Sequence, residues 1–288
     1  MSLFTRLKRH GFLGLLHLFR VNLAHYTPSA VKRPLKRALG RNMPALYNYF
    51  WQRSNPTERI AIHGFVDAAP GGHEEERRAI VKSITEVHKW VECGHLQAEI
   101  LEVLASILNF PADTAGVVVE AGTFKGGSAA KLSWACACRG RRLVIFDSFE
   151  GLPDNAEPHD RTIFGEKANF TKGAYEGSLE VVKGNIHKYG RIETCEFVKG
   201  WFEDTMPTLA TPVIAAYVDV DLASSTRACM KYLFPHLVRG GVIFSQDGHL
   251  PLVINVLADD DFWQDEVGVT RPRMVGLGSC KLVQIWKD

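Results

Sequence analysis

The sequence predicts an α/β protein built on a mostly parallel, doubly wound sheet with helices on both faces. After residue 113, short runs of β-branched and apolar residues alternate with helical patterns. Several of these runs are apolar at nearly every position, as in strands that are buried on both faces. The chain has 288 residues, of which 46% are hydrophobic and 23% are charged. This composition is typical of a soluble globular protein and excludes a largely disordered or fibrous chain.

The first 53 residues form a basic arm. They hold ten of the 34 Lys and Arg residues of the chain and none of its 32 acidic residues. Residues 3–24 have the pattern of a basic amphipathic helix, and no apolar run there is long enough to cross a bilayer. We expect the arm to pack on the body of the protein or on a second copy in a homo-oligomer. Peripheral membrane contact through residues 1–40 and a transit peptide are the alternatives.

The six cysteines include no C-x-x-C pair. This pattern favours reduced thiols in a cytoplasmic protein over a disulfide framework or a zinc site. Residues 54–75 are interrupted by Pro and Gly, and we expect a loop region there. We therefore assign residues 1–75 to a partly helical arm with a loop region, and residues 76–288 to one α/β domain.

The elements of this domain follow in order from the hydrophobic pattern. Two helices are expected over residues 74–108, separated near Gly94. Strands are expected over residues 116–120, 143–147, 196–199, 213–221, 241–245 and 281–286. Helices are expected over residues 127–138, 179–188, 226–237 and 251–260. Parallel sheets of this kind bind ligands at the carboxyl ends of their strands, so the side chains at those ends are the candidates for function.

The first strand ends in an acid and a glycine-rich turn. Gly122 permits a tight turn, and Gly126 lets the backbone approach a ligand closely. Glu120 would repel a diphosphate but suits a cofactor that carries a positive charge. The second strand ends at Asp147, one strand–helix–strand unit further on, where a carboxylate can accept hydrogen bonds from two ribose hydroxyls. The alternative is that Asp147 is a capping or turn residue.

Two further acids follow the long strand over 213–221. Side chains at positions i and i+2 of a strand share a face, so Asp219 and Asp221 are expected to lie together. Two adjacent carboxylates repel each other unless a cation or a proton lies between them, and Mg²⁺ prefers such oxygen ligands. Asp247 follows the next strand and would add a third carboxylate. The alternative is that Asp219 and Asp221 are capping residues in a polar rim.

These segments resemble the macrocin O-methyltransferase type of class I S-adenosylmethionine-dependent enzymes, which methylate sugar hydroxyls. The matching segments are residues 119–128, 147–153, 200–207, 219–221 and 246–247. The resemblance implies a Rossmann-like, seven-stranded sheet. It also implies a Mg²⁺-assisted O-methyltransferase that acts on a hydroxyl of a sugar or a glycosylated small molecule. A glycan is an equivalent partner class, and no nucleic acid is expected.

The resemblance also implies roles for particular residues. Asp221 would be the general base, and Asp219, Gln246 and Asp247 would bind Mg²⁺. The cofactor S-adenosylmethionine would be held by Glu120, Gly122, Thr123, Gly126, Ser128, Asp147, Ser148 and Trp201. The family usually has two adjacent acids where this chain has Gln246 and Asp247, so we expect weaker metal binding here.

Two functions of other classes stay open at this point. A metal-dependent glycosyltransferase would use Asp219 and Asp221 as an Asp-x-Asp pair on a sugar-nucleotide diphosphate, but Glu120 in the first turn speaks against it. A non-catalytic, membrane-associated binding protein would explain the basic arm and the uncharged Gln246. We expect a cytoplasmic protein, with a peripheral membrane location as the alternative.

Overall fold

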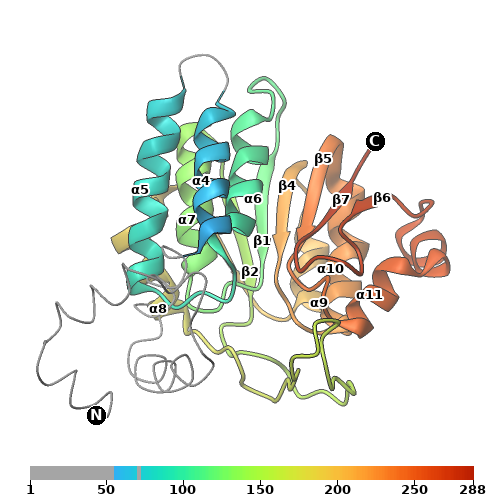
Figure 1. Cartoon of the computed structure of the whole chain (residues 1–288). Coiled ribbons are helices and arrows are strands. Elements are labelled where there is room, and N and C mark those ends of the chain that lie inside the picture. Colours follow the sequence, from blue (N-terminus) through green and yellow to red (C-terminus); the bar gives the residue numbers. More distant parts are fainter. Residues whose placement is uncertain (1–54, 70–72) are drawn as a thin grey trace, which may run out of the picture. The chain divides into compact units, whose positions relative to one another are not determined.

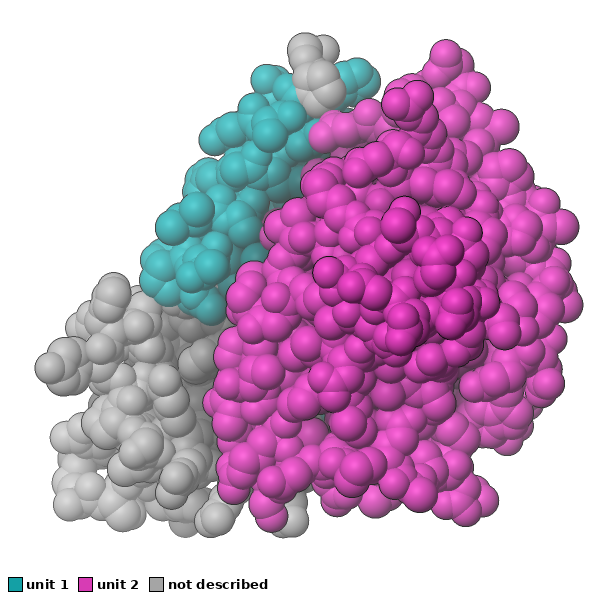
Figure 2. All heavy atoms as spheres, turned by 90° about the vertical axis from the view of Figure 1, so that its right-hand side faces the viewer, with its two compact units in different colours: residues 1–98 teal, residues 99–288 magenta. Residues whose placement is uncertain are grey.

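A computed structural model describes residues 55–69 and 73–288 (Figure 1). The chain divides into two compact units, residues 1–98 and residues 99–288, which Figure 2 colours separately. The helix expected over 3–24 and the membrane contact expected through 1–40 lie outside the described residues. Within the described ranges, no helix has both the length and the apolar character needed to span a bilayer. The functional boundary predicted near residue 75 stays a prediction.

The described part of the first unit contains α4 (Pro56–Asp67), α5 (Glu74–Trp90) and the first residues of α6 (Gln97–Asn109). α5 and α6 confirm the two helices expected on either side of Gly94. The loop expected over 54–75 is wrong for α4. The side chain of Asn55 accepts the Thr57 N–H at 3.0 Å, and Pro56 occupies the first helical position. Asn followed by Pro is therefore a helix start here rather than a loop signal.

The second unit is built on a seven-stranded sheet, as predicted. The strands are β1 (Val117–Ala121), β2 (Leu143–Asp147), β3 (Cys195–Lys199), β4 (Val213–Val218), β5 (Leu237–Ser245), β6 (Arg273–Val275) and β7 (Val283–Trp286). Their order is β3-β2-β1-β4-β5-β7-β6. The pairings from β3 to β5 are parallel, and β7 pairs antiparallel with both β5 and β6. The order reverses between β1 and β4, which is where ligands bind in sheets of this type.

Helices cover the sheet. They are α7 (Gly127–Cys138), α8 (Leu179–Tyr189), the short α9 (Phe202–Thr205), α10 (Ala223–His236) and α11 (Pro251–Ala258). Val117, Val119 and Ala121 of β1 pack in one core cluster with side chains of α10 and α11. Because side chains alternate along a strand, Glu120 points to the opposite face.

The end of β4 differs from the prediction. The strand ends at Val218, so Asp219 and Asp221 lie in the turn that leads into α10 rather than in the strand. Asp221 has φ +60°, which no strand residue adopts. β6 and a π-helical turn over Phe262–Val267 were not predicted. β6 is three residues long and largely exposed, so it lacks the apolar run by which the other strands are recognised.

Candidate active site

The turn between β4 and α10, residues 219–222, is held by hydrogen bonds that its backbone N–H groups donate. The Asp219 N–H donates to the Ala121 carbonyl of β1 at 2.9 Å. The next two N–H groups, of Val220 and Asp221, both donate to Oδ2 of Asp247 at 2.9 Å. Buried backbone donors that find such partners fix the chain path, here with Asp221 in a left-handed conformation.

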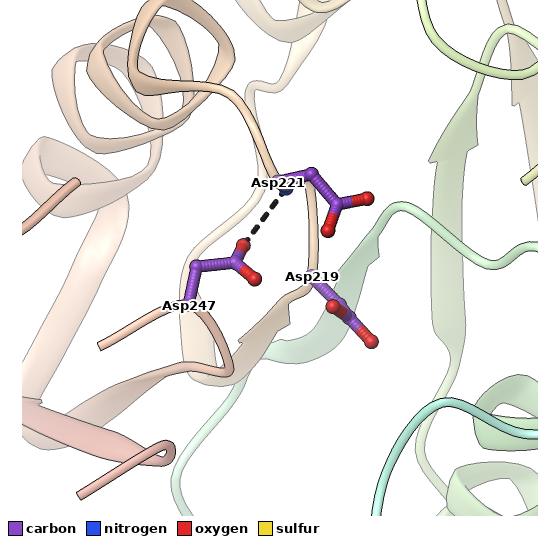
Figure 3. A group of neighbouring side chains, drawn as sticks. All are labelled: Asp219, Asp221 and Asp247. Carbon is purple, nitrogen blue, oxygen red and sulfur yellow. Dashed lines mark hydrogen bonds between the residues drawn. The ribbon is translucent and has the colours of Figure 1, made fainter. Parts of the chain in front are cut away.

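Three carboxylates converge at this turn (Figure 3). Asp219, Asp221 and Asp247 each offer an oxygen, and these three oxygens lie within 4.8 Å of one another. Asp247 is buried, while Asp219 and Asp221 are half-buried. The structure therefore brings together the three acids that the sequence singles out, although the turn and not strand alternation does so.

The cluster is electrostatically unfavourable without a counter-charge. Burial, and then the charges of Asp247 and Glu99, raise the pKa of Asp219 to about 7, while Lys281 and the Tyr217 hydroxyl oppose the shift. Burial and the neighbouring acids Asp247 and Asp219 raise the pKa of Asp221 well above its usual range. Oxygen donors under this repulsion are what a hard divalent cation neutralises. The donor set thus fits Mg²⁺.

Gln246 lies beside the cluster and is fully buried. Its Nε2 donates to a carboxylate oxygen of Glu99 in α6 at 2.8 Å. Its Oε1 has no hydrogen-bond partner within the described residues. The amide is thus oriented by Glu99, a residue that no sequence motif marks as functional. The role of Gln246 as a metal ligand stays a prediction.

Glu120 is buried at the carboxyl end of β1. Neither of its carboxylate oxygens has hydrogen-bonding geometry to a group within residues 55–69 and 73–288. Burial raises the pKa of Glu120 to about 8, and the nearby hydroxyls of Ser128 and Thr123 only partly offset this. A buried carboxyl without a partner is costly, and a positively charged group would relieve that cost. The position therefore fits a cationic cofactor.

Asp147 joins the loops that follow the first two strands. Its Oδ2 accepts the Thr123 N–H at 2.7 Å, and its Oδ1 accepts the Phe149 N–H at 2.6 Å. This geometry matches the turn role that the sequence left open as the alternative. Each carboxylate oxygen keeps a second lone pair, so contact with ribose hydroxyls stays a prediction. The Ser148 hydroxyl is used locally, since it donates to the Gly151 carbonyl at 3.0 Å.

The glycines of the first turn have a packing reason. Gly122 has φ +80°, and a Cβ there would lie 2.0 Å from the carbonyl oxygen of Asp219. Only glycine therefore lets β1 approach the turn that carries the acids. Gly126 has φ +79° and precedes α7, where a Cβ would come within 3.1 Å of Val182. Their contact with a cofactor stays a prediction.

The remaining candidates lie at the start of helices. Ser128 is buried near the beginning of α7. Trp201 precedes α9 and leaves 37% of its surface exposed, and its carbonyl accepts the Thr205 N–H at 3.0 Å. An exposed indole after β3 is free to contact a ligand, and its assignment to the adenine stays a prediction.

The segment between β2 and α8 contributes residues that sequence reasoning missed. Glu157, His159 and Tyr175 lie in this segment, which has no periodic hydrophobic pattern. Glu157 contacts the first residues of α10. These residues directly follow the turn over 219–222, which we call the acidic turn. The only local signal was the density of charged and aromatic residues, which is not specific.

The fold is that of the class I methyltransferases. The structure of the O-methyltransferase NovP matches with a TM-score of 0.55 at 21% identity, covering 70% of this chain and 86% of that one. The structure of CalS11, a calicheamicin methyltransferase, matches with a TM-score of 0.50 at 19% identity, covering 81% and 94%. At these identities the likeness concerns the fold alone.

The family is defined by sequence. Residues 95–272 match the model of the macrocin-O-methyltransferase (TylF) family, and the chain belongs to this family. This confirms the family that the motifs predicted.

Two curated relatives are similar over part of the chain. The 8-demethyl-8-(2,3-dimethoxy-alpha-L-rhamnosyl)-tetracenomycin-C 4'-O-methyltransferase of Streptomyces olivaceus is 34% identical over 140 residues, which are 46% of this chain and 52% of that protein. The mycinamicin III 3''-O-methyltransferase of Micromonospora griseorubida is 31% identical over 144 residues, 47% and 56% of the two chains. The chain thus spans about half the length of the curated relatives it matches.

Proposed function

We propose that the protein is an S-adenosylmethionine-dependent, Mg²⁺-assisted O-methyltransferase that acts on a sugar hydroxyl of a glycosylated small molecule. The observation that carries this proposal is the cluster of Asp219, Asp221 and Asp247 at the end of the strand next to Glu120. Family membership supports the same reaction, and the rhamnosyl group in the name of the Streptomyces olivaceus relative supports the substrate class.

Glu120, Thr123 and Asp147 would hold the cofactor. S-adenosylmethionine supplies a methyl group that is already activated by its sulfonium charge. Glu120 offers a positive group two buried oxygens that have no hydrogen-bond partner within the described residues, and Asp147 fixes the Thr123 backbone beside it. The chain's own contribution is to orient the cofactor and to replace water around it.

Asp219 and Asp247 would hold the cation, with Gln246 as a neutral third ligand. When bound, Mg²⁺ would supply polarisation of the acceptor hydroxyl. Asp221 would accept the proton of that hydroxyl on its carboxylate as a general base, while the methyl group passes from the sulfonium sulfur to the hydroxyl oxygen and S-adenosylhomocysteine leaves. Its left-handed backbone conformation holds the carboxylate at the cluster.

Binding and turnover experiments test this proposal. S-adenosylhomocysteine is titrated calorimetrically against the full chain, with a nucleoside diphosphate as the comparison ligand. Glycosylated acceptors with adjacent hydroxyls are then screened with Mg²⁺ and with EDTA. Binding of S-adenosylhomocysteine and Mg²⁺-dependent methyl transfer are expected. Binding of the nucleoside diphosphate instead would favour the glycosyltransferase, and binding of neither would favour the binding protein.

The remaining sequence-based expectations are unchanged. A cytoplasmic location, a homo-oligomer, the peripheral membrane contact through residues 1–40 and the absence of a nucleic-acid partner stay predictions.

A further inference from the structure

The segment between β2 and α8, residues 152–177, crosses to the carboxyl ends of β4 and β5. Its two ends are paired, because the Leu152 N–H donates to the Ala174 carbonyl and the Gly173 N–H donates to the Leu152 carbonyl, both at 2.9 Å. In its middle, the Ile163 N–H donates to the carbonyl of His249, two residues after Asp247, at 2.9 Å. We call residues 152–177 the crossing segment.

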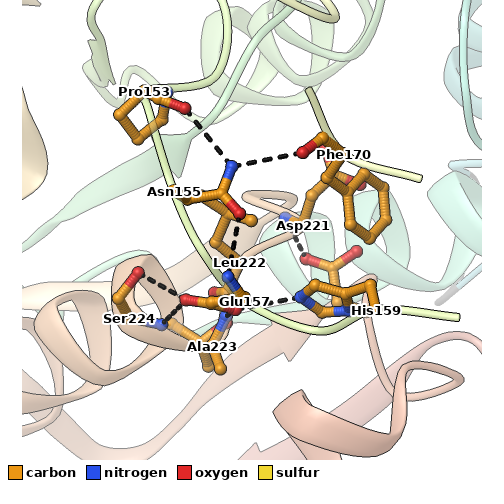
Figure 4. Close-up of polar contacts among 11 residues, drawn as sticks. Pro153, Asn155, Glu157, His159, Phe170, Asp221, Leu222, Ala223 and Ser224 are labelled. Carbon is orange, nitrogen blue, oxygen red and sulfur yellow. Dashed lines mark hydrogen bonds and ion pairs between the residues drawn. The ribbon is translucent and has the colours of Figure 1, made fainter. Parts of the chain in front are cut away.

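Glu157 fastens the crossing segment to α10 (Figure 4). Its Oε2 accepts the Ala223 N–H at 2.8 Å. Its Oε1 accepts both the N–H and the hydroxyl of Ser224, at 2.9 and 2.7 Å. A carboxylate at these first N–H groups is a favourable helix cap, although it comes from a distant part of the chain. Partial burial opposes the charge, but the bonds from Ser224, Ala223 and His159 lower the pKa of Glu157.

Glu157 and Asp247 hold the acidic turn from its two sides. Asp247 accepts hydrogen bonds from the N–H groups of Val220 and Asp221. Glu157 accepts hydrogen bonds from those of Ala223 and Ser224. The position of Asp221 is thereby coupled to the position of the crossing segment. Figure 4 draws Asp221 together with His159 and Phe170 of that segment.

A series of ring contacts connects His159, which lies next to Glu157, with Phe124 in the loop after β1. The His159 Nε2 lies 2.9 Å from Glu157, and the His159 ring meets Phe170 edge-on with centroids 4.8 Å apart. Phe170 contacts Tyr175 at 6.4 Å, and Tyr175 contacts Phe124 at 5.8 Å. Phe124 and Tyr175 have φ +49° and +58°, conformations that bulky residues rarely adopt. Such strain is typical of functional sites.

Tyr175 is half-exposed and lies near the three acids. Half of its surface is accessible, in contrast to the buried rings of the sheet. Burial, followed by the charges of Asp221, Asp219 and Asp247, raises the pKa of Tyr175 to about 12. The geometry agrees, because Phe170 and His159 connect the ring to Glu157, which is bonded to the residues directly after Asp221 and Leu222. The ring therefore belongs to the part of the crossing segment that is fastened beside Asp221. Aromatic rings of this kind line sites for glycosides and other partly apolar ligands.

We propose that the crossing segment forms one wall of the acceptor site, with the Tyr175 ring as the acceptor contact and Glu157 as the positioning residue that fastens the wall. This inference rests on the proposed O-methyltransferase activity and concerns only how the acceptor is held. The acceptor class is a glycoside that presents the apolar face of its sugar ring to Tyr175.

The role of Tyr175 is tested by steady-state kinetics with the glycoside acceptor found in the screen. Tyr175→Ala is expected to raise the acceptor KM about tenfold, which corresponds to about 1.4 kcal/mol. Tyr175→Phe keeps the ring, so its acceptor KM is expected to stay within about threefold of the wild-type value. A threefold change corresponds to about 0.65 kcal/mol, less than half the loss expected for Tyr175→Ala. The Kd of S-adenosylhomocysteine should stay unchanged in both. A wild-type acceptor KM in Tyr175→Ala would overturn the assignment.

The role of Glu157 is tested by proteolysis, which needs no activity. Lys167 and Lys172 are exposed in the crossing segment and are trypsin sites. In Glu157→Gln, cleavage after these lysines should be faster by about tenfold or more, the scale of losing hydrogen bonds to a charged group. Glu166→Gln, an exposed acid in the same segment, is the matched control and should be cleaved like the wild type.

The same Glu157→Gln variant should show a raised acceptor KM and a lowered kcat, with unchanged affinity for S-adenosylhomocysteine. A faster cleavage with wild-type kinetics would show a purely structural clamp and overturn the proposed role. Failure of the wild type to bind S-adenosylhomocysteine would instead contradict the proposed function, so the two failures are distinguishable.

Discussion

Oδ2 of Asp247 accepts a hydrogen bond from the backbone N–H of Asp221 at 2.9 Å, which ties the end of β5 to the turn after β4 (Figure 3). One carboxylate oxygen thus organises the backbone, and the second faces the other acids. The side chain of Asp221 is free of this bond, so its carboxylate can be altered without removing the contact that shapes the turn.

Glu120 makes the stability of the ligand-free protein depend on pH. In the unfolded chain this carboxyl ionises near pH 4.5, whereas burial in the folded protein raises its pKa to about 8. Between these values the folded state holds the proton and the unfolded state does not, so stability falls as pH rises, by up to about 1.4 kcal/mol per pH unit, and the loss is complete above the folded pKa.

Glu120→Gln removes this penalty. The variant should be more stable than the wild type in urea unfolding at pH 8, with a smaller difference at pH 5. Glu166→Gln is the control, because this exposed acid should change stability little at either pH. A pH-independent difference between wild type and Glu120→Gln would mean that Glu120 is ionised in the fold.

The sheet was predictable because its strands are buried on both faces. The limits of β2 and α7 were predicted to the residue, since β2 is an apolar run that ends at Asp147 and α7 is a mostly small and apolar run that ends before Arg139. The meeting of the acids at the strand ends was predictable for a second reason, since parallel strands bring their carboxyl ends to one edge of the sheet.

The turn after β4 and the crossing segment were not predictable from local patterns. Glu157 and Ala223 are 66 positions apart, and their hydrogen bond leaves no periodicity in the sequence. The helix α4 was missed because Asn55 and Pro56 mark a helix start as well as a loop, and only the packing decides between them. Likewise, the partner of Gln246 is Glu99, 147 positions away.

The contact between Gln246 and Glu99 changes what is expected of a more acidic metal site. Gln246→Asp should raise the affinity for Mg²⁺, because it adds a charged oxygen ligand. The same change removes the bond from Nε2 and places a second carboxylate near Glu99, which should destabilise the metal-free protein by about 1–3 kcal/mol.

The double variant Gln246→Asp with Glu99→Gln should recover stability, because the amide and the carboxylate exchange places. Thermal unfolding with and without Mg²⁺ measures both effects in one double-mutant cycle. Additive effects of the two substitutions on the unfolding free energy would show that the two side chains do not interact.

Asp147 is expected to affect the cofactor and the first turn together. Asp147→Ala leaves the N–H groups of Thr123 and Phe149 without their acceptor, and it should weaken S-adenosylhomocysteine binding by about 1.5–3 kcal/mol. Calorimetry measures this loss, and circular dichroism checks the fold. An unchanged cofactor affinity in a folded variant would remove Asp147 from the cofactor site.

The general base is tested with Asp221→Asn. Asn is tolerated at φ +60° better than most residues, and the backbone bond to Asp247 is kept, so the turn should be preserved. The amide cannot accept a proton as a carboxylate does. Asp265→Asn, at an exposed acid far along the chain, is the matched control for the substitution itself.

The kcat of Asp221→Asn at saturating cofactor, Mg²⁺ and acceptor tests the account most directly. A fall of about 10²–10⁴ relative to the wild type is predicted, with the Kd of S-adenosylhomocysteine unchanged and Asp265→Asn fully active. A kcat close to that of the wild type would contradict the assignment of Asp221 as the base, and His249, two residues after Asp247, would be the next residue to test.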